Sequence, residues 1–190
     1  DKEFVRKAPG LLADYGPPVC FGEDHFAHLG EEARPDYRWL IAGPARSGSF
    51  FHKDPNATSA WNAVVSGSKK WVLFPPEVAP PGVHASADGA DVATSVSLAE
   101  WFLNFYAEAR ASEEPPLECV VRAGEVIFVP SGWWHLVLNV EDSVAVTQNF
   151  CSRANLRRVE SALRRPHLVS GCPEEARGTL HARFLAALRK

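Results

Sequence analysis

Short apolar runs rich in aromatic and β-branched residues follow one another along most of the chain, and turn residues separate them. The runs lie at 37–44, 49–55, 59–75 and 117–150, and Pro and Gly mark their boundaries. Such residues suit a pleated, half-buried surface. Many short strands with regular turn punctuation are typical of a β-sandwich or jelly roll. We therefore expect a mainly β protein, either a β-sandwich or a jelly roll.

Helical patterns lie beside and after these runs. We expect helices at 97–110, 153–165 and 173–189. The first opens with a capping box, Ser97 with Glu100 three residues on, and the last opens with Pro173 as its first helical residue. We divide the chain into a jelly-roll domain at 1–150 and a C-terminal helical extension at 151–190.

The turn at Gly67-Ser68 predicts how two of the strands pair. Gly at the first central position suits a two-residue type II′ hairpin, which would place Asn62 and Lys69 on one face of the ribbon. We also expect the run at 49–55 to continue the sheet of the run before it.

A second turn, beginning at Glu141, leaves two registers open. A two-residue loop would put Thr147 opposite Leu136. A three-residue loop would put it opposite Val137, on the face that carries His135. A slip of one residue moves every side chain to the other face of a strand, so the sequence does not decide between the two registers.

Composition is that of a globular protein, with 46% hydrophobic and 11% aromatic residues in 190. No apolar run approaches the roughly 20 residues that cross a bilayer, so we expect no membrane association. The chain contains no Met, so we expect residues to precede Asp1. The four cysteines are scattered without a C-x-x-C pair, which favours reduced thiols in an intracellular protein.

The net charge of −3 is unevenly distributed. Residues 151–190 carry nine Arg/Lys against three Asp/Glu, or +6, which leaves −9 for residues 1–150. A basic segment could contact RNA or an acidic surface, and the alternative is a solvated helix face. Leu180, Phe184 and Leu188 recur at helical spacing, so this stripe either forms a homodimer or packs on its own domain.

The stretch "FFHKDP" carries the first candidate chemistry. In an extended strand His52 and Asp54 point to the same side, and His135, which begins "HLVLNV", is the candidate third ligand. Two histidines and one carboxylate form the facial triad of non-haem Fe(II) oxygenases, whereas zinc enzymes prefer tetrahedral sites. The remaining histidines are interpreted as ordinary surface or core residues: His25, His28, His84, His167 and His181.

Lys69 could distinguish iron from zinc chemistry. A lysine inside a small barrel is costly unless it meets an anion, and an oxygenase with a dicarboxylate co-substrate needs a basic group at its far end. The alternative is a solvated edge residue, and the residues alone leave both readings open.

Two longer motifs carry a family resemblance. They are "PDYRWLIAGPARSGSFFHKDPNATSAWNAVVSGSKKWVLFP" and "AGEVIFVPSGWWHLVLNVEDSVAVTQNF". With them the chain resembles the Jumonji-C, cupin-type 2-oxoglutarate oxygenases, in particular the phosphatidylserine-receptor-like branch. The resemblance implies a double-stranded β-helix with flanking and C-terminal helices. It also indicates that the N-terminal part of the family domain is largely absent from this chain.

The same resemblance implies a site. Its metal ligands for Fe(II) would be His52, Asp54 and His135. Its 2-oxoglutarate contacts would be Lys69, Thr147, Ser49, Asn62 and Asn149.

The resemblance further implies a dioxygenase that hydroxylates a protein or peptide side chain, with lysine favoured, or that demethylates methyl-arginine. It also implies an intracellular location, with the nucleus favoured over the cytoplasm. Two alternatives stay open: an RNA-associated oxygenase, and a catalytically inactive metal-binding cupin that serves as an interaction module.

Overall fold

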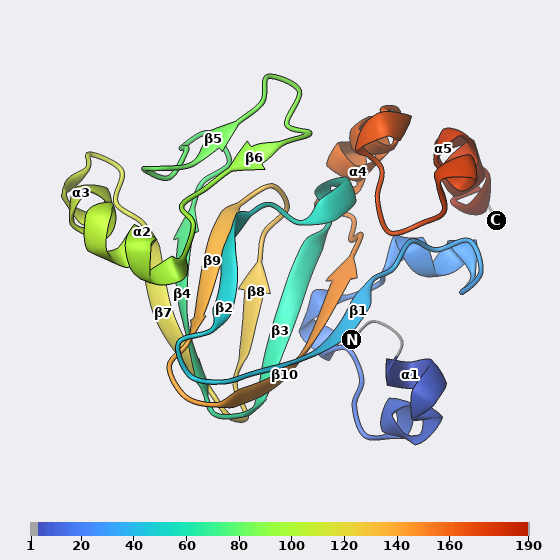
Figure 1. The fold of residues 1–190 in the computed structure, drawn as a ribbon. Helices are drawn as coiled ribbons and strands as arrows, with labels where there is room; N and C mark the ends of the chain where they lie inside the picture. Colours follow the sequence, from blue (N-terminus) through green and yellow to red (C-terminus); the bar gives the residue numbers. More distant parts are fainter. Residues whose placement is uncertain (1–3, 190) are drawn as a thin grey trace.

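The computed structural model describes residues 4–189, and its centre is a pair of four-stranded antiparallel sheets (Figure 1). One sheet has the order β1-β10-β3-β8 and the other the order β2-β9-β4-β7. The strands are β1 (Arg38–Gly43), β2 (Gly48–His52), β3 (Ser59–Ser66), β4 (Ser68–Phe74), β7 (Leu117–Arg122), β8 (Val126–Val129), β9 (Trp134–Asn139) and β10 (Ser143–Phe150). The expected jelly roll is confirmed.

Within the two four-stranded sheets, strands that follow one another in sequence do not pair. β1 and β2 lie in different sheets, and so do β3 and β4. The predicted hairpin at Gly67 is therefore wrong, and so is the prediction that 49–55 continues the sheet of β1. The residues of a turn indicate only that the chain reverses its direction locally. β3 cannot pair with β4, because both of its edges are hydrogen-bonded to the distant strands β8 and β10.

The sequence left open whether Thr147 lies opposite Leu136 or Val137, and the structure shows neither pairing. β9 and β10 also belong to opposite sheets, and Thr147 pairs with Asn62 on one side and Trp39 on the other. Both hairpin registers assumed a pairing that does not exist.

The helices lie outside the sandwich. The 97–110 helix is two helices, α2 (Leu98–Asn104) and α3 (Tyr106–Ala111), and the Ser97 side chain accepts from the Glu100 backbone N as predicted. The 82–95 span contains a small hairpin of β5 (His84–Ala85) and β6 (Val92–Ala93). Near the N-terminus α1 (Phe4–Lys7) precedes the 3₁₀ turns Pro9–Ala13, Val19–Phe21 and η3 (His25–Leu29).

The C-terminal helices are α4 (Leu156–Leu163) and α5 (Glu174–Ala187). Pro173 is the N-cap of α5, so the helix begins at Glu174, one position after the predicted start. Leu180 and Phe184 are 1% and 0% exposed, in a cluster with Phe26 of η3 and with α4. The stripe proposed as a dimer interface therefore packs on its own chain. Within residues 4–189 no helix combines the length and the apolar character that a bilayer crossing requires.

Candidate functional site

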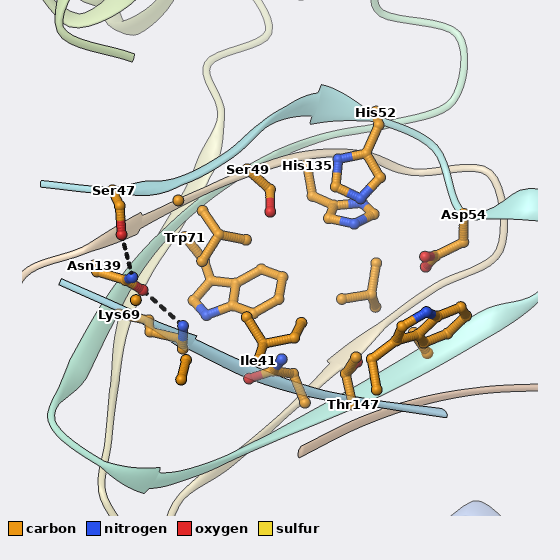
Figure 2. Close-up of a pocket in the computed structure, with 18 of the residues that line it drawn as sticks. Ile41, Ser47, Ser49, His52, Asp54, Lys69, Trp71, His135, Asn139 and Thr147 are labelled. Carbon is orange, nitrogen blue, oxygen red and sulfur yellow. Dashed lines mark hydrogen bonds between the residues drawn. The ribbon is translucent and has the colours of Figure 1, made fainter. Parts of the chain in front are cut away.

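A cavity of about 530 Å³ lies between the two sheets. Its walls come from the inward faces of the strands, where every second residue points inside. All eight site residues from the sequence line it: Ser49, His52, Asp54, Asn62, Lys69, His135, Thr147 and Asn149. Figure 2 shows His52, His135 and Asp54 at one end of the cavity and Lys69 at the other.

His52 and His135 are direct cross-strand neighbours, on β2 and β9. Their ring centroids are 4.1 Å apart. His52 Nδ1 lies 2.7 Å from the Phe50 carbonyl oxygen, and His135 Nδ1 lies 3.1 Å from that of Trp133. Because a carbonyl only accepts, each Nδ1 carries the proton, and each Nε2 keeps a free lone pair for a metal. Burial, with a smaller contribution from His52, lowers the pKa of His135 to about 3.

Asp54 follows β2 in extended conformation, so the two-residue period that aligns it with His52 continues past the strand. The next residues turn sharply, since Asn56 and Ala57 both adopt a positive φ of 55°. The Ala57 carbonyl, which this turn brings inward, accepts from Ser131 Oγ at 2.6 Å. Backbone strain of this kind persists only where surrounding contacts hold it. The turn keeps the carboxylate beside the two imidazoles.

The three side chains fit a metal ion. Their ligand atoms lie within 4.8 Å of one another, and Asp54 Oδ2 is buried with no hydrogen-bond partner among the described residues. Burial raises the pKa of the Asp54 carboxyl, and the nearby His52 opposes this shift. A buried acceptor without a partner is costly, and a cation held by two imidazole nitrogens and this oxygen would satisfy it. The donor set suits Fe(II) and leaves positions open.

Lys69 projects from β4 into the other end of the cavity and is 3% exposed. Its Nζ donates to Asn139 Oδ1 at 2.6 Å, and Asn139 Nδ2 donates to Ser47 Oγ at 2.9 Å (Figure 2). Burial lowers the pKa of the Lys69 ammonium. The lysine is thus an inward residue, not a solvated edge residue.

Polar groups from the opposite sheet face Lys69 and the triad across the cavity. Thr147 Oγ1 donates to the Trp61 carbonyl at 2.8 Å, and Asn149 Nδ2 donates to Thr58 Oγ1 at 2.8 Å. Asn62 Oδ1 is buried and has no partner among the described residues. The prediction that Asn62 and Lys69 share one face of a ribbon is wrong, because β3 and β4 belong to different sheets. Both residues nevertheless line the cavity, from opposite walls.

The sequence reasoning missed several lining residues. Asn139 holds Lys69, and Trp71 lies near His135, with ring centroids 5.9 Å apart. Trp71 Nε1 is a buried donor with no partner in residues 4–189. The alternation of inward and outward residues could have identified both. Asn139 is four residues beyond His135 and Trp71 is two beyond Lys69, each on the inward face of the same strand.

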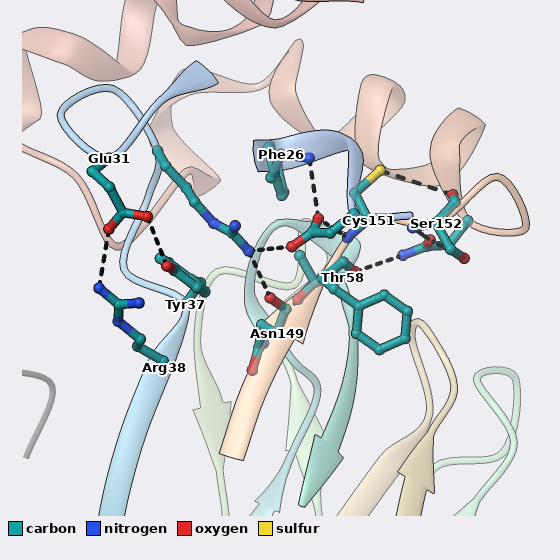
Figure 3. Close-up of polar contacts among 12 residues, drawn as sticks. Phe26, Glu31, Tyr37, Arg38, Thr58, Asn149, Cys151 and Ser152 are labelled. Carbon is teal, nitrogen blue, oxygen red and sulfur yellow. Dashed lines mark hydrogen bonds and ion pairs between the residues drawn. The ribbon is translucent and has the colours of Figure 1, made fainter. Parts of the chain in front are cut away.

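A polar network outside the cavity anchors the end of β10 (Figure 3). Arg34 forms an ion pair with Asp24 and donates to the Asn149 carbonyl at 3.2 Å. Asp24 Oδ1 also accepts from the backbone N of Phe26 and of Cys151, at 3.1 and 3.0 Å. These contacts tie the strand end that carries Asn149 to the segment preceding β1.

The chain is similar to known proteins over most of its length. The profile of the cupin-like domain family matches residues 17–155. The chain is 57% identical over 193 residues to the arginine-specific demethylase JMJ22 of Arabidopsis thaliana, covering 100% of this chain and 38% of the relative. It is 40% identical over 184 residues to the bifunctional arginine demethylase and lysyl-hydroxylase psr-1 of Caenorhabditis elegans, covering 92% and 44%.

A third relative is the 2-oxoglutarate and iron-dependent oxygenase JMJD4 of Homo sapiens, 42% identical over 142 residues, with 73% of this chain and 33% of the relative covered. The chain spans less than half the length of each of these curated relatives.

Proposed function

The chain belongs to the cupin-like domain family, in its Jumonji-C group, and from this premise we propose that it is the core of an Fe(II)- and 2-oxoglutarate-dependent oxygenase that oxidises protein side chains. The observation that carries the proposal is the presence, in one cavity, of a His-Asp-His cluster and a buried lysine without a carboxylate partner among the described residues.

His52, Asp54 and His135 would hold the iron. Iron held there would supply, with 2-oxoglutarate and O2, the oxidation of a substrate C–H bond, with conversion of the co-substrate to succinate and CO2. Lys69 would bind the distal carboxylate of 2-oxoglutarate, since a buried ammonium without an anionic partner favours an anion.

Other residues prepare this pocket for its occupant. Asn139 orients the Lys69 ammonium. The Thr147 hydroxyl would exchange its bond to the Trp61 carbonyl for one to the co-substrate carboxylate. Trp71, which lies between the two ends of the cavity (Figure 2), would help to exclude water, and exclusion of water strengthens each electrostatic contact.

A basic side chain is the substrate class we favour, lysine for hydroxylation or methyl-arginine for demethylation. The support is twofold: relatives whose names include both activities, and the −9 charge of residues 1–150, which would attract cationic peptides. The intracellular, nuclear location is part of the same proposal and rests on the resemblance and on four free cysteines.

The test is turnover with Fe(II), ascorbate and 2-oxoglutarate on peptides that contain lysine or methyl-arginine. We expect succinate in proportion to peptide oxidation. Mass spectrometry separates the two activities as gain of one oxygen or loss of one methyl group. His52→Ala is the matched control and should lose at least about a hundredfold in rate, the scale at which loss of a metal-site partner acts. The proposal would be refuted if the wild type and His52→Ala formed equal amounts of succinate and neither oxidised any peptide.

The two alternatives have less support. An inactive cupin module gives no reason for a complete triad with a buried lysine. RNA contact by the basic C-terminal segment stays a prediction. Two of its arginines already have partners in the chain, because Arg158 donates to the Ser131 carbonyl and Arg164 pairs with Glu160.

A further inference from the structure

A second cluster of metal-ligand side chains lies outside the sandwich, in the segment before β1. Glu23, His25 and His28 offer one carboxylate and two imidazoles whose ligand atoms lie within 4.8 Å of one another. We propose that these three residues bind a divalent transition-metal ion, zinc foremost, at a site separate from the cavity between the sheets. This site does not depend on the proposed oxygenase activity.

Local backbone geometry brings the ligands together. His25 and His28 are the first and fourth residues of the 3₁₀ helix η3. A 3₁₀ helix has three residues per turn, so side chains three apart lie one above the other. The two imidazole centroids are 5.9 Å apart. Asp24 caps the helix by accepting from the Phe26 backbone N, which leaves the Glu23 side chain free to lie beside the rings.

The distances suit a single ion. His28 Nε2 is 3.1 Å from Glu23 Oε1, and His25 Nδ1 is 4.0 Å from Glu23 Oε2. Zinc bonds of about 2.0–2.2 Å place two ligands of a tetrahedral ion roughly 3.4 Å apart. Small rotations close the difference, because the Glu23 and His28 side chains are 64% and 41% exposed.

An unpartnered nitrogen points to a missing ligand. His25 Nδ1 is shielded from solvent and has no hydrogen-bond partner among the described residues. Most buried polar atoms in proteins have a partner, and each exception requires an explanation. A metal ion bound at this nitrogen supplies one.

The donor set selects the metal. Two neutral imidazoles with one carboxylate suit zinc, with water in the fourth position, and copper or nickel would bind by the same chemistry. The three ligands come from six consecutive residues, so binding an ion also fixes this segment.

The location of η3 gives the ion a structural role. The His25 backbone N donates to the Cys151 carbonyl at 2.7 Å, just beyond β10. The Phe26 ring lies 4.9 Å from that of Phe184 in α5. η3 therefore joins the C-terminal helices to the end of β10, and Figure 3 shows Phe26 and Cys151 at this junction. An ion on its outer face would hold the junction together.

Titration with Co(II), followed by the visible absorption of the bound ion, and with Zn(II), followed by calorimetry, tests the site. We expect the wild-type chain to bind one equivalent more than His28→Ala. His84→Ala is the matched control, because it removes another exposed histidine, in the β5–β6 hairpin, and should bind like the wild type. His135→Ala, which lacks a ligand of the cavity site, should retain one equivalent. Equal stoichiometry and affinity in the wild type and His28→Ala would overturn the proposal.

Thermal unfolding provides a second measurement. Zinc at a hundredfold excess over its Kd should raise the unfolding temperature of His135→Ala by about 5–10 °C. Adding Glu23→Gln to that chain should abolish most of this rise. Glu23 is exposed, so this variant also serves if His28→Ala does not fold. An equal rise in both chains would contradict a role for the cluster.

Discussion

Arg34 and Lys69 are two buried cations that the fold treats differently. The Arg34 side chain is 5% exposed and is paired with the Asp24 carboxylate, and it also donates to the Asn149 carbonyl. Lys69 is 3% exposed, but its bond partner among the described residues is the neutral amide of Asn139.

The difference separates a structural ion pair from a binding group. A buried charge is costly unless it is paired. For Arg34 the chain itself supplies the anion, and the pair anchors the end of β10. For Lys69 an anion from outside would fill that role, and the lowered pKa of Lys69 reflects burial without such a partner. The following predictions test this contrast.

Removing the partner of Arg34 should have the largest effect. Asp24→Ala leaves the guanidinium buried and unpaired, so we expect a loss of about 3–5 kcal/mol in unfolding free energy, measured by urea denaturation. Glu31→Ala breaks the exposed pair with Arg38 and should cost no more than about 1 kcal/mol. Equal losses in the two variants would remove the contrast.

Lys69→Met, unlike Asp24→Ala, should weaken the binding of 2-oxoglutarate without loss of stability. The unfolding free energy should stay the same or rise, because an uncompensated buried charge is replaced by an apolar side chain. The KM for 2-oxoglutarate should rise by about thirtyfold or more, as expected when one partner of a buried charge pair is lost. Lys70→Met is the control, since Lys70 pairs with Glu118 and should leave KM unchanged. A destabilised Lys69→Met with normal KM would show that Lys69 is structural.

Asn139→Ala should have a smaller effect than Lys69→Met on the binding of 2-oxoglutarate. It removes a hydrogen bond to a charged donor, which typically contributes about 1.5–3 kcal/mol. We expect the KM for 2-oxoglutarate to rise about tenfold while kcat changes less. A steady-state titration of the co-substrate in both proteins measures this. A change in kcat alone would indicate that Asn139 does not act through Lys69.

The pH dependence of stability should give the smallest effect. The pKa of Lys69 is lower in the folded chain than its ordinary value of 10.5. At pH values between the folded pKa and 10.5, the unfolded chain therefore binds more protons than the folded chain. Stability from this group therefore rises with pH in that alkaline window. The stability advantage of Lys69→Met should be full below the folded pKa and shrink as pH approaches 10.5. Urea denaturation from neutral pH to the alkaline limit of folding would measure it. A pH-independent difference would contradict the burial argument.

Part of the site was predictable from signals that are local in sequence, and the family resemblance implied the complete ligand set and the 2-oxoglutarate contacts. The alternation of inward and outward residues aligned His52 with Asp54, and the same period, carried further along each strand, reaches Asn139 from His135 and Trp71 from Lys69. The choice between β-sandwich and jelly roll stayed open from the strand-rich runs and their turns, and the family resemblance indicated the jelly roll.

Strand pairing was not predictable in this way. The turns at Gly67 and Glu141 indicate that the chain reverses, but a reversal can return to the same sheet or cross to the other. Pairing with distant strands decided that choice.

The sequence by itself determined the mainly β class of the fold, the chemistry of the triad, and that His52 and Asp54 point to the same side. Only the tertiary structure decided which wall of the cavity each residue occupies, that Leu180 and Phe184 pack inside their own chain, and that His25 and His28 lie beside Glu23. The physical reason is that side-chain direction depends on neighbouring backbone, whereas burial, ion pairing and pairing of sheets depend on contacts between residues far apart in sequence.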